Sequence, residues 1–166
     1  MKVSEVMTGK EPSAAYNGVV TNDANVLAID ISETPTGKIG DYVVAQICIS
    51  GVDAQLNPET EDKTYIRAGK ATTKTATQRT FNVTGDKYDG DAFQDFISSH
   101  KIKFGTGQDV IVPYVYFSVL TGKGEKGKAA IIVNSDGSGE AGASAEIDVD
   151  VMAVETPAEY TYSADV

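Results

Sequence analysis

Residues Ala145–Met152, AEIDVDVM, hold the most regular pattern in the chain and decide its fold class. Apolar and acidic side chains alternate along them with a period of two, which predicts a half-buried β-strand. The apolar face holds Ala145, Ile147, Val149 and Val151, and the opposite face holds Glu146, Asp148 and Asp150. Because alternate residues of a strand lie about 7 Å apart, we expect some of these carboxylates to find bases on neighbouring strands.

Two apolar segments upstream predict further strands. Residues 109–120, DVIVPYVYFSVL, are the most apolar run, and Pro113 in the middle removes a hydrogen-bond donor, which favours an edge or bent strand. Residues 129–133, AAIIV, are followed by the turn-forming cluster NSDGSG at 134–139. The pattern is that of strands joined by tight turns.

A G-x-G-x-x-G motif at Gly122, Gly124 and Gly127 lies between these two strands. In dinucleotide-binding proteins this spacing follows a strand and opens a helix, whose N-terminus faces the phosphates. Here a short β-branched run and a turn follow instead, so the motif predicts a Gly-rich hairpin loop and no nucleotide site.

One segment has helical periodicity. In residues 91–102, DAFQDFISSHKI, the apolar positions and His100 recur at helical intervals, and Asp91 and Gln94 are spaced as a capping box. Gly105 and Gly107 would end this helix. The preceding TQRTFNVT, residues 77–84, alternates as a strand with Phe81 and Val83 inward. The only His would thus lie on the face of a helix that packs across a sheet.

The first half of the chain is more polar. Residues 1–41 predict an N-terminal arm with one short strand at 26–31, and residues 42–50, YVVAQICIS, predict the first strong strand. Residues 153–166 predict a C-terminal arm. The fold class is therefore mainly β, a β-sandwich or split β-barrel with one flanking α-helix at about 91–102 and extended N- and C-terminal arms, in a single domain over residues 1–166.

Residues 51–77 are too polar for a core and predict a long loop or hairpin excursion, with a short strand at 65–68 in its centre. The excursion holds a basic cluster: Lys63, Arg67, Lys70 and Lys74. One interpretation is a solvated hairpin face. The other is a contact to an acidic neighbouring subunit.

Composition argues against most catalytic and nucleic-acid-binding classes. The net charge of −10 disfavours adhesion to DNA or to anionic membranes. The single Cys48 and single His100 cannot build a disulfide or a His-based metal site, and DKYDGD at 86–91 lacks the register of a calcium loop. No signal peptide or apolar run of roughly 20 residues is present. We therefore predict no catalytic, cofactor-binding or metal-binding residues, no cofactor and no membrane partner.

The chain resembles phage major tail proteins, the tail tube proteins of long-tailed phages, over about residues 72–162. The resemblance rests on VTGDKYDGDAFQDF at a strand-to-helix junction, the strand VPYVYF, and the hairpin segments GKGEKG and VNSDG. These are packing and turn motifs, and the first seventy residues match only in general character.

The resemblance implies a twisted β-sandwich or split barrel whose hexameric rings stack into a tube. The tube would conduct DNA from capsid to host cell, in a virion tail assembled in the bacterial cytoplasm. The expected partners are further copies of the chain, tape measure, tail-tip and tail-terminator proteins, and genomic DNA passing without specific binding. We favour a non-contractile, siphophage tail over the inner tube of a contractile one.

Two groups of residues acquire roles from this resemblance. Glu146, Asp148 and Asp150 would line a negative lumen that repels the phosphate backbone, or else face outward or pair with lysines at a ring interface. The basic cluster and the two arms would contact neighbouring subunits or rings, ordering on assembly. The alternative function is a monomeric β-sandwich binding module, an adhesin or carbohydrate binder, with Tyr88, Tyr114 and Tyr116 as an aromatic platform.

Overall fold

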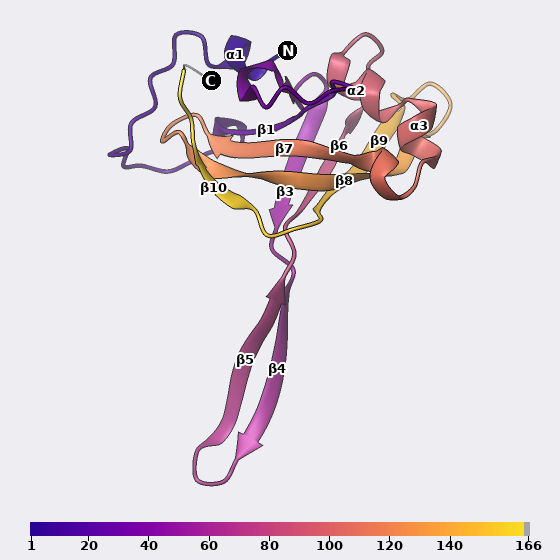
Figure 1. Cartoon of the computed structure of the whole chain (residues 1–166). Helices are drawn as coiled ribbons and strands as arrows, with labels where there is room; N and C mark the ends of the chain where they lie inside the picture. The colour runs from indigo at the N-terminus through magenta and orange to yellow at the C-terminus, as the bar shows by residue number, and fades with distance from the viewer. Residues whose placement is uncertain (165–166) are drawn as a thin grey trace.

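The protein is described by a computed structural model over residues 1–164, and it is mainly β, as the sequence predicts. One eight-stranded sheet runs in the order β2-β1-β7-β8-β9-β6-β3, with β10 also paired to β8. The sheet curls into a half-barrel, and the separate two-stranded hairpin β4–β5 projects from it (Figure 1). All pairings are antiparallel, as expected for strands joined by short turns.

The strands are β1 (Asn25–Ile29), β2 (Val43–Val44), β3 (Ile49–Gln55), β4 (Pro58–Tyr65), β5 (Gly69–Thr77), β6 (Thr80–Asp86), β7 (Ile111–Ser118), β8 (Lys123–Ser138), β9 (Glu146–Ala153) and β10 (Ala158–Thr161). The α-helices are α1 (Val3–Val6), α2 (Ala92–Ile97) and α3 (His100–Phe104). Single 3₁₀ turns are η1 (Asn22–Ala24), η2 (Ile39–Asp41) and η3 (Gly107–Val110).

Apolar side chains fill both faces of the sheet, but unequally. The inner face carries the larger cluster, in which Phe81, Tyr114 and Val149 are fully buried beneath α2 and α3. On the outer face a second cluster around Val115 and Phe117 includes Val3 and Met7 from the N-terminal segment around α1 and Tyr160 from β10. No apolar cluster of residues 1–164 covers the outer face of β3, β6 and β9, so the alternation of β9 gives a buried apolar side and an open acidic side.

The predicted strand at 42–50 is wrong, because only Val43–Val44 pair before the chain turns and β3 begins at Ile49. The turn places exposed Cys48 at a φ of 57°, in the left-handed region. Gly85 on the neighbouring strand makes this possible, since any side chain there would collide with the backbone of Cys48. A local pattern could not reveal a turn that depends on a residue so far along the chain.

The predicted helix at 91–102 is two short helices. Asp91 caps α2 by accepting a hydrogen bond from the Gln94 backbone N–H at 3.3 Å, as expected. The Gln94 side chain does not complete the capping box but binds the Tyr88 N–H and the carbonyls of Ile47 and Asp86. Ser99 has extended backbone angles and divides α2 from α3, because Ser favours caps over helix interiors.

Pro113 does not mark an edge, because β7 lies between β1 and β8. The carbonyl and the missing N–H of one residue face the same neighbour in an antiparallel strand. The Pro113 carbonyl accepts a hydrogen bond from Asp30 N at 2.9 Å, just beyond the end of β1. The N–H that Pro113 lacks would therefore point toward β1 at the position where the β1–β7 ladder ends. Placing Pro at a ladder end avoids the loss of a central hydrogen bond.

The glycine motif is also not a loop, since β8 includes residues 123–138 and no helix follows. Gly124 lies opposite Phe117, where a side chain would collide with the β7 backbone, and the Tyr114 ring covers Gly127. Two of the three glycines therefore allow strands to pack closely. The nucleotide interpretation has no structural support in residues 1–164.

The two arms are partly packed, contrary to the sequence expectation. Val3 and Met7 of the N-terminal segment are buried against the outer cluster, and so is Tyr160 of β10. The N-terminal residues that follow Met7, 8–21, lack helices and strands, and their side chains are exposed except for the half-buried Pro12. Positions 165–166 of the predicted C-terminal arm lie outside the described residues.

Candidate assembly surfaces

The first candidate surface is the uncovered outer face of β3, β6 and β9, which we call the acidic face. Its carboxylates alternate with buried or half-buried residues along each strand and are brought side by side by the register. They are Asp53, Asp86, Glu146, Asp148 and Asp150. The sequence pattern revealed the three on β9, and only the sheet register adds the other two.

Asparagine amides, and not bases, hold the acidic face together. Asn82 Nδ2 donates to Asp148 and to Asp150, at 2.8 Å each, and Asn134 Nδ2 donates to Asp150 at 2.9 Å. None of the five carboxylates forms a salt bridge within residues 1–164. The expectation of basic partners for the β9 carboxylates is therefore wrong, and the negative charge of this face is not neutralised by a neighbouring base.

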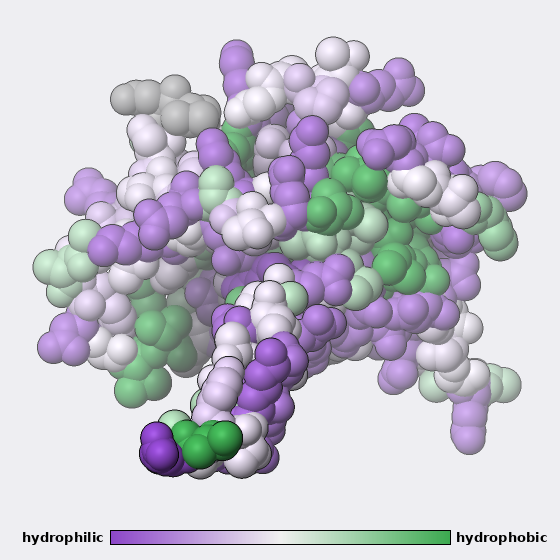
Figure 2. Space-filling view, turned by 60° about the horizontal axis from the view of Figure 1, so that its bottom comes forward, coloured by the Kyte–Doolittle hydropathy of each residue, from purple (hydrophilic) through white to green (hydrophobic). Residues whose placement is uncertain are grey.

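The second candidate surface is the hairpin β4–β5. Its side chains are exposed on both faces, with only Ala71 half-buried. Figure 2 shows it standing clear of the body, with a hydrophobic group at its tip. Residues 66–68, part of the predicted strand at 65–68, form its turn, with Arg67 at a φ of 70°.

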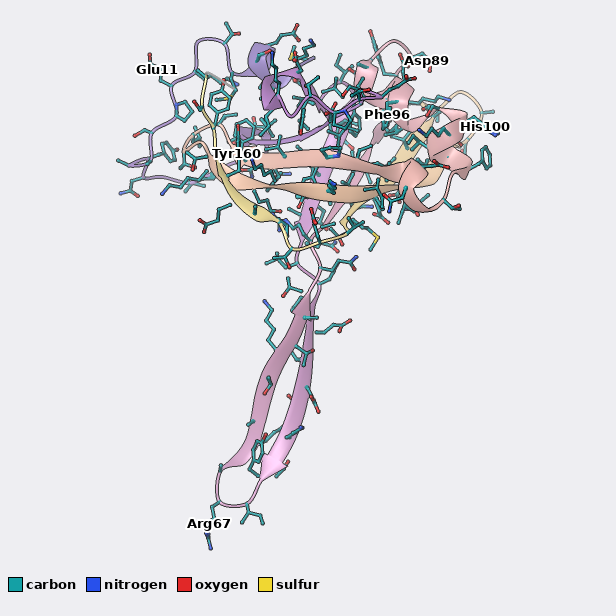
Figure 3. All side chains as sticks on the ribbon, in the orientation of Figure 1. Glu11, Arg67, Asp89, Phe96, His100 and Tyr160 are labelled. Carbon is teal, nitrogen blue, oxygen red and sulfur yellow. The ribbon has the colours of Figure 1, made fainter. Side chains whose placement is uncertain are left out.

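The basic cluster does not form one patch. Lys70 and Lys74 share one face of the ribbon, Lys63 lies on the other, and Arg67 is at the far end (Figure 3). Lys70 binds Asp62 across the strands at 3.0 Å, and Lys63 lies 3.6 Å from Glu61. A hydrogen bond from Thr72, and then Lys70, lower the pKa of Asp62.

The hairpin is joined to the body through Arg79, which follows β5. Its Nε donates to Glu125 Oε1 at 2.7 Å, and its guanidinium lies over the rings of Phe81 and Tyr116 at 4.8 Å and 5.2 Å. Asn57, with a φ of 43°, donates to Thr80 at 3.0 Å on the opposite chain segment. These contacts make the hairpin a continuation of the β3–β6 pair, held at its base.

The third candidate surface is a cleft of about 310 Å³ where the half-barrel fails to close, between β3 and the start of β1. We call it the seam groove. Its apolar wall includes Leu27, Ala45, Val52 and Tyr116, and Asp23 contributes a carboxylate. Burial raises the pKa of Tyr116, and the charge of Arg79 opposes this rise. The raised pKa favours the neutral phenol on this wall. The outer edge of β3 borders this groove and pairs with no strand in the described part of the chain.

Other candidate sites are not assembled. His100 is exposed at the start of α3, 4.9 Å from the Phe104 ring, so the prediction that it packs across the sheet is wrong (Figure 3). Tyr114 is 1% exposed, so the three tyrosines of the binding-module hypothesis do not form a surface platform. Within residues 1–164 there is no group of three potential metal ligands and no helix long and apolar enough to cross a membrane.

No protein-family model matches the sequence, and no curated protein matches it. Several solved chains resemble the fold, among them two from gene transfer agent particles. A chain from the tail of an empty GTA particle, refined with C6 symmetry, has a TM-score of 0.57 at 16% identity and aligns over 87% of this chain and 100% of its own length. A chain from the virion of a native gene transfer agent (GTA) particle has a TM-score of 0.54 at 10% identity, with the same coverages. The chain therefore has the fold of a phage-like tail protein, in keeping with its sequence resemblance to tail tube proteins.

Proposed function

We propose that this chain is a structural virion protein, the major tail tube subunit of a phage-like particle. The observation that carries the proposal is the fold shared with a chain of a six-fold symmetric tail, over 87% of this chain. Six copies would form a ring, and stacked rings would form a tube that conducts DNA from the capsid to the host cell. The whole chain would act as one tube domain, in a tail assembled in the host cytoplasm.

The acidic face is the proposed lumen lining. It is the part of the sheet without a covering helix or strand, and amide donors order its carboxylates without cancelling their charge. A lumen of this sign would repel DNA phosphates and let the duplex slide without adhesion. DNA would therefore be a passing cargo, and the ring contacts would form elsewhere on the subunit.

The hairpin and the free edge of β3 are the proposed contact elements. The edge of β3 can continue into a neighbour's sheet and satisfy its open backbone groups, whereas the outer edge of β2 is already bonded to residues 1–3. Lys63, Arg67, Lys70 and Lys74 would contact the next subunit or ring. Tape measure, tail-tip and tail-terminator proteins would bind the ends of the stack and its interior.

Electron microscopy of the purified protein over a range of concentrations and storage times tests the proposal. We expect rings or hollow tubes of one diameter, and a variant with residues 58–77 replaced by a short turn should stop at rings or smaller assemblies. Small particles alone at every concentration, even with tail-tip protein added as an initiator, would contradict the proposal and favour a monomeric function.

Charge reversal tests the lumen separately. Particles built with Glu146→Lys, Asp148→Lys and Asp150→Lys together should form tubes of normal diameter but eject DNA poorly. A matched control is the reversal of three exposed hairpin acids, Glu59→Lys, Glu61→Lys and Asp62→Lys, which should leave passage through any formed tube unaffected. Normal ejection through tubes with the reversed acidic face would exclude a lumenal position for it.

A further inference from the structure

The tip of the hairpin is an apolar and basic group that the described chain leaves uncovered. Ile66 is 93% exposed and Tyr65 is 52% exposed. Next to them Arg67 occupies a left-handed backbone conformation, which costs energy for a residue with a side chain. A two-stranded hairpin alone in water is marginally stable, so a second surface is needed to fix this tip.

The seam groove offers a surface of matching character. Its wall is formed by half-buried and buried apolar side chains, among them Leu27, Val52 and Tyr116. Along its side runs the edge of β3 with which no strand of residues 1–164 pairs, and the Val52 carbonyl on this edge accepts a side-chain bond from Asn22 at 3.0 Å. The groove therefore combines apolar surface with open backbone groups, the two features that an incoming hairpin tip can use.

Strand β3 relates the groove and the hairpin geometrically. Its first residues, Ile49 to Val52, line the groove, and its last residue, Gln55, leads within three positions into the hairpin. The groove and the tip thus lie toward opposite ends of one strand direction (Figure 1). A contact between the tip of one copy and the groove of the next is head-to-tail, and a head-to-tail contact repeats from copy to copy, into an open stack where the rotation between copies does not close a ring.

Charge also favours a second copy as the occupant. Residues 58–77 contain four bases and three acids, which gives the hairpin a net charge of +1. Since the whole chain has a net charge of −10, the body without the hairpin has a net charge of −11. From Lys63 to Thr77 there is no acid at all, and this basic stretch includes Arg67 at the tip. Lys10 and Asp23 both line the groove, so its own charges balance, and the attraction comes from the opposite net charges of hairpin and body, with Asp23 as the local carboxylate for a basic tip.

We propose that the hairpin tip, residues Tyr65–Arg67, of one copy inserts into the seam groove of a second copy. Ile66 packs against Leu27, Val52 and Tyr116, and Arg67 lies toward Asp23. This inference rests on the proposed tube function, and it names the receptor surface that the function leaves open.

The single native cysteine provides the test. Cys48 is exposed and lies between Gln46 and Ile49, both of which line the groove. Chains carrying Ile66→Cys are mixed with an excess of unmodified chains, allowed to assemble, and treated with a short bis-maleimide. The matched control carries Thr75→Cys on the shaft of the hairpin, and a second control adds Cys48→Ser to all chains.

The inference predicts a covalent dimer whose linked peptides join position 66 of one chain to Cys48 of another. The yield should fall at least tenfold for Thr75→Cys, and the dimer should vanish with Cys48→Ser. Rings or tubes that form normally but give no such link, or link position 66 to itself, would overturn the groove assignment and leave the proposed function intact. A complete absence of assembly by the unmodified chain would overturn both.

Discussion

The body and the hairpin of this protein are built from the same kind of strand pair but are stabilised differently. In the β3–β6 pair the inward side chains of β6, Phe81 and Val83, are fully buried, and those of β3, Val52 and Ala54, are half-buried. In the β4–β5 pair, which continues the same two chain segments, every side chain is exposed except that of Ala71, which is half-buried. Backbone pairing is the same in both regions, so pairing alone does not show which strands form the stable core. Burial of side chains stabilises the body, whereas the exposed side chains of the hairpin remain available to contact another molecule.

The largest contrast should come from truncating one apolar side chain in each region. Phe81→Ala removes a fully buried ring that contacts Tyr114 and Tyr116, and it should lower the free energy of unfolding by about 3–5 kcal/mol. Ile66→Ala at the exposed tip should change it by less than about 0.5 kcal/mol. Urea unfolding followed by circular dichroism measures both, and equal effects would refute the division into a packed body and an unpacked hairpin.

A smaller effect is expected at the junction of the two regions. Arg79→Ala removes the ion pair with Glu125 and the contacts with two rings, and should cost about 1–3 kcal/mol. The control is Lys2→Ala, whose 3.0 Å pair with Asp41 is half exposed and should contribute less than about 1 kcal/mol. A double-mutant cycle with Glu125→Gln isolates the pair, and a coupling energy no larger than that of the Lys2 pair would mean that Arg79 does not anchor the hairpin.

The acidic face should respond less again. Asn82→Ala leaves Asp148 and Asp150 without their shared donor, and we expect a loss of about 1 kcal/mol in the same unfolding measurement. Asn134→Ala removes one bond from a more exposed side chain and should cost less. A gain in stability from Asn82→Ala would show that the amide does not order these carboxylates.

The smallest effect concerns the pH response of the hairpin. The pKa of Asp62 is lowered by Thr72 and Lys70, so its contribution is present above the ordinary value of 3.8 and is lost as the pH falls below that value toward the lowered pKa. In an NMR titration, the amide chemical shifts of residues 62 and 72 should change in this pH range, while the amide chemical shifts of β6 should stay constant. Asp62→Asn should abolish the change, and an identical titration in that variant would exclude Asp62 as its cause.

The same contrast explains how far sequence could predict the structure. The alternation in β9 and the burial of Phe81 and Val83 were predictable, because burial on one face leaves a periodic record. The break at Cys48 was not, because it depends on Gly85 across the sheet. The prediction that Pro113 marks an edge strand was wrong, because the sequence shows the missing N–H but not where the β1–β7 ladder ends.

The candidate surfaces were predictable only in part. The β9 carboxylates and the basic residues were visible in the sequence, but the partners of the carboxylates were not, since Asn82 and Asn134 reach them from neighbouring strands that are distant in sequence. The seam groove had no sequence signal, because it forms from segments around residues 22–27, 44–52 and 116–119. A surface made by sheet closure, or by its failure, appears only in three dimensions.

The central claim is that the acidic face lines the lumen, and the position of a label tests it most directly. Chains carrying Glu146→Cys and Cys48→Ser are labelled with a small gold cluster after assembly in mixture with unmodified chains, and end views of the rings are averaged by electron microscopy. The account predicts added density inside the ring wall, around the central channel. Density at the outer rim, with rings of unchanged diameter, would contradict it.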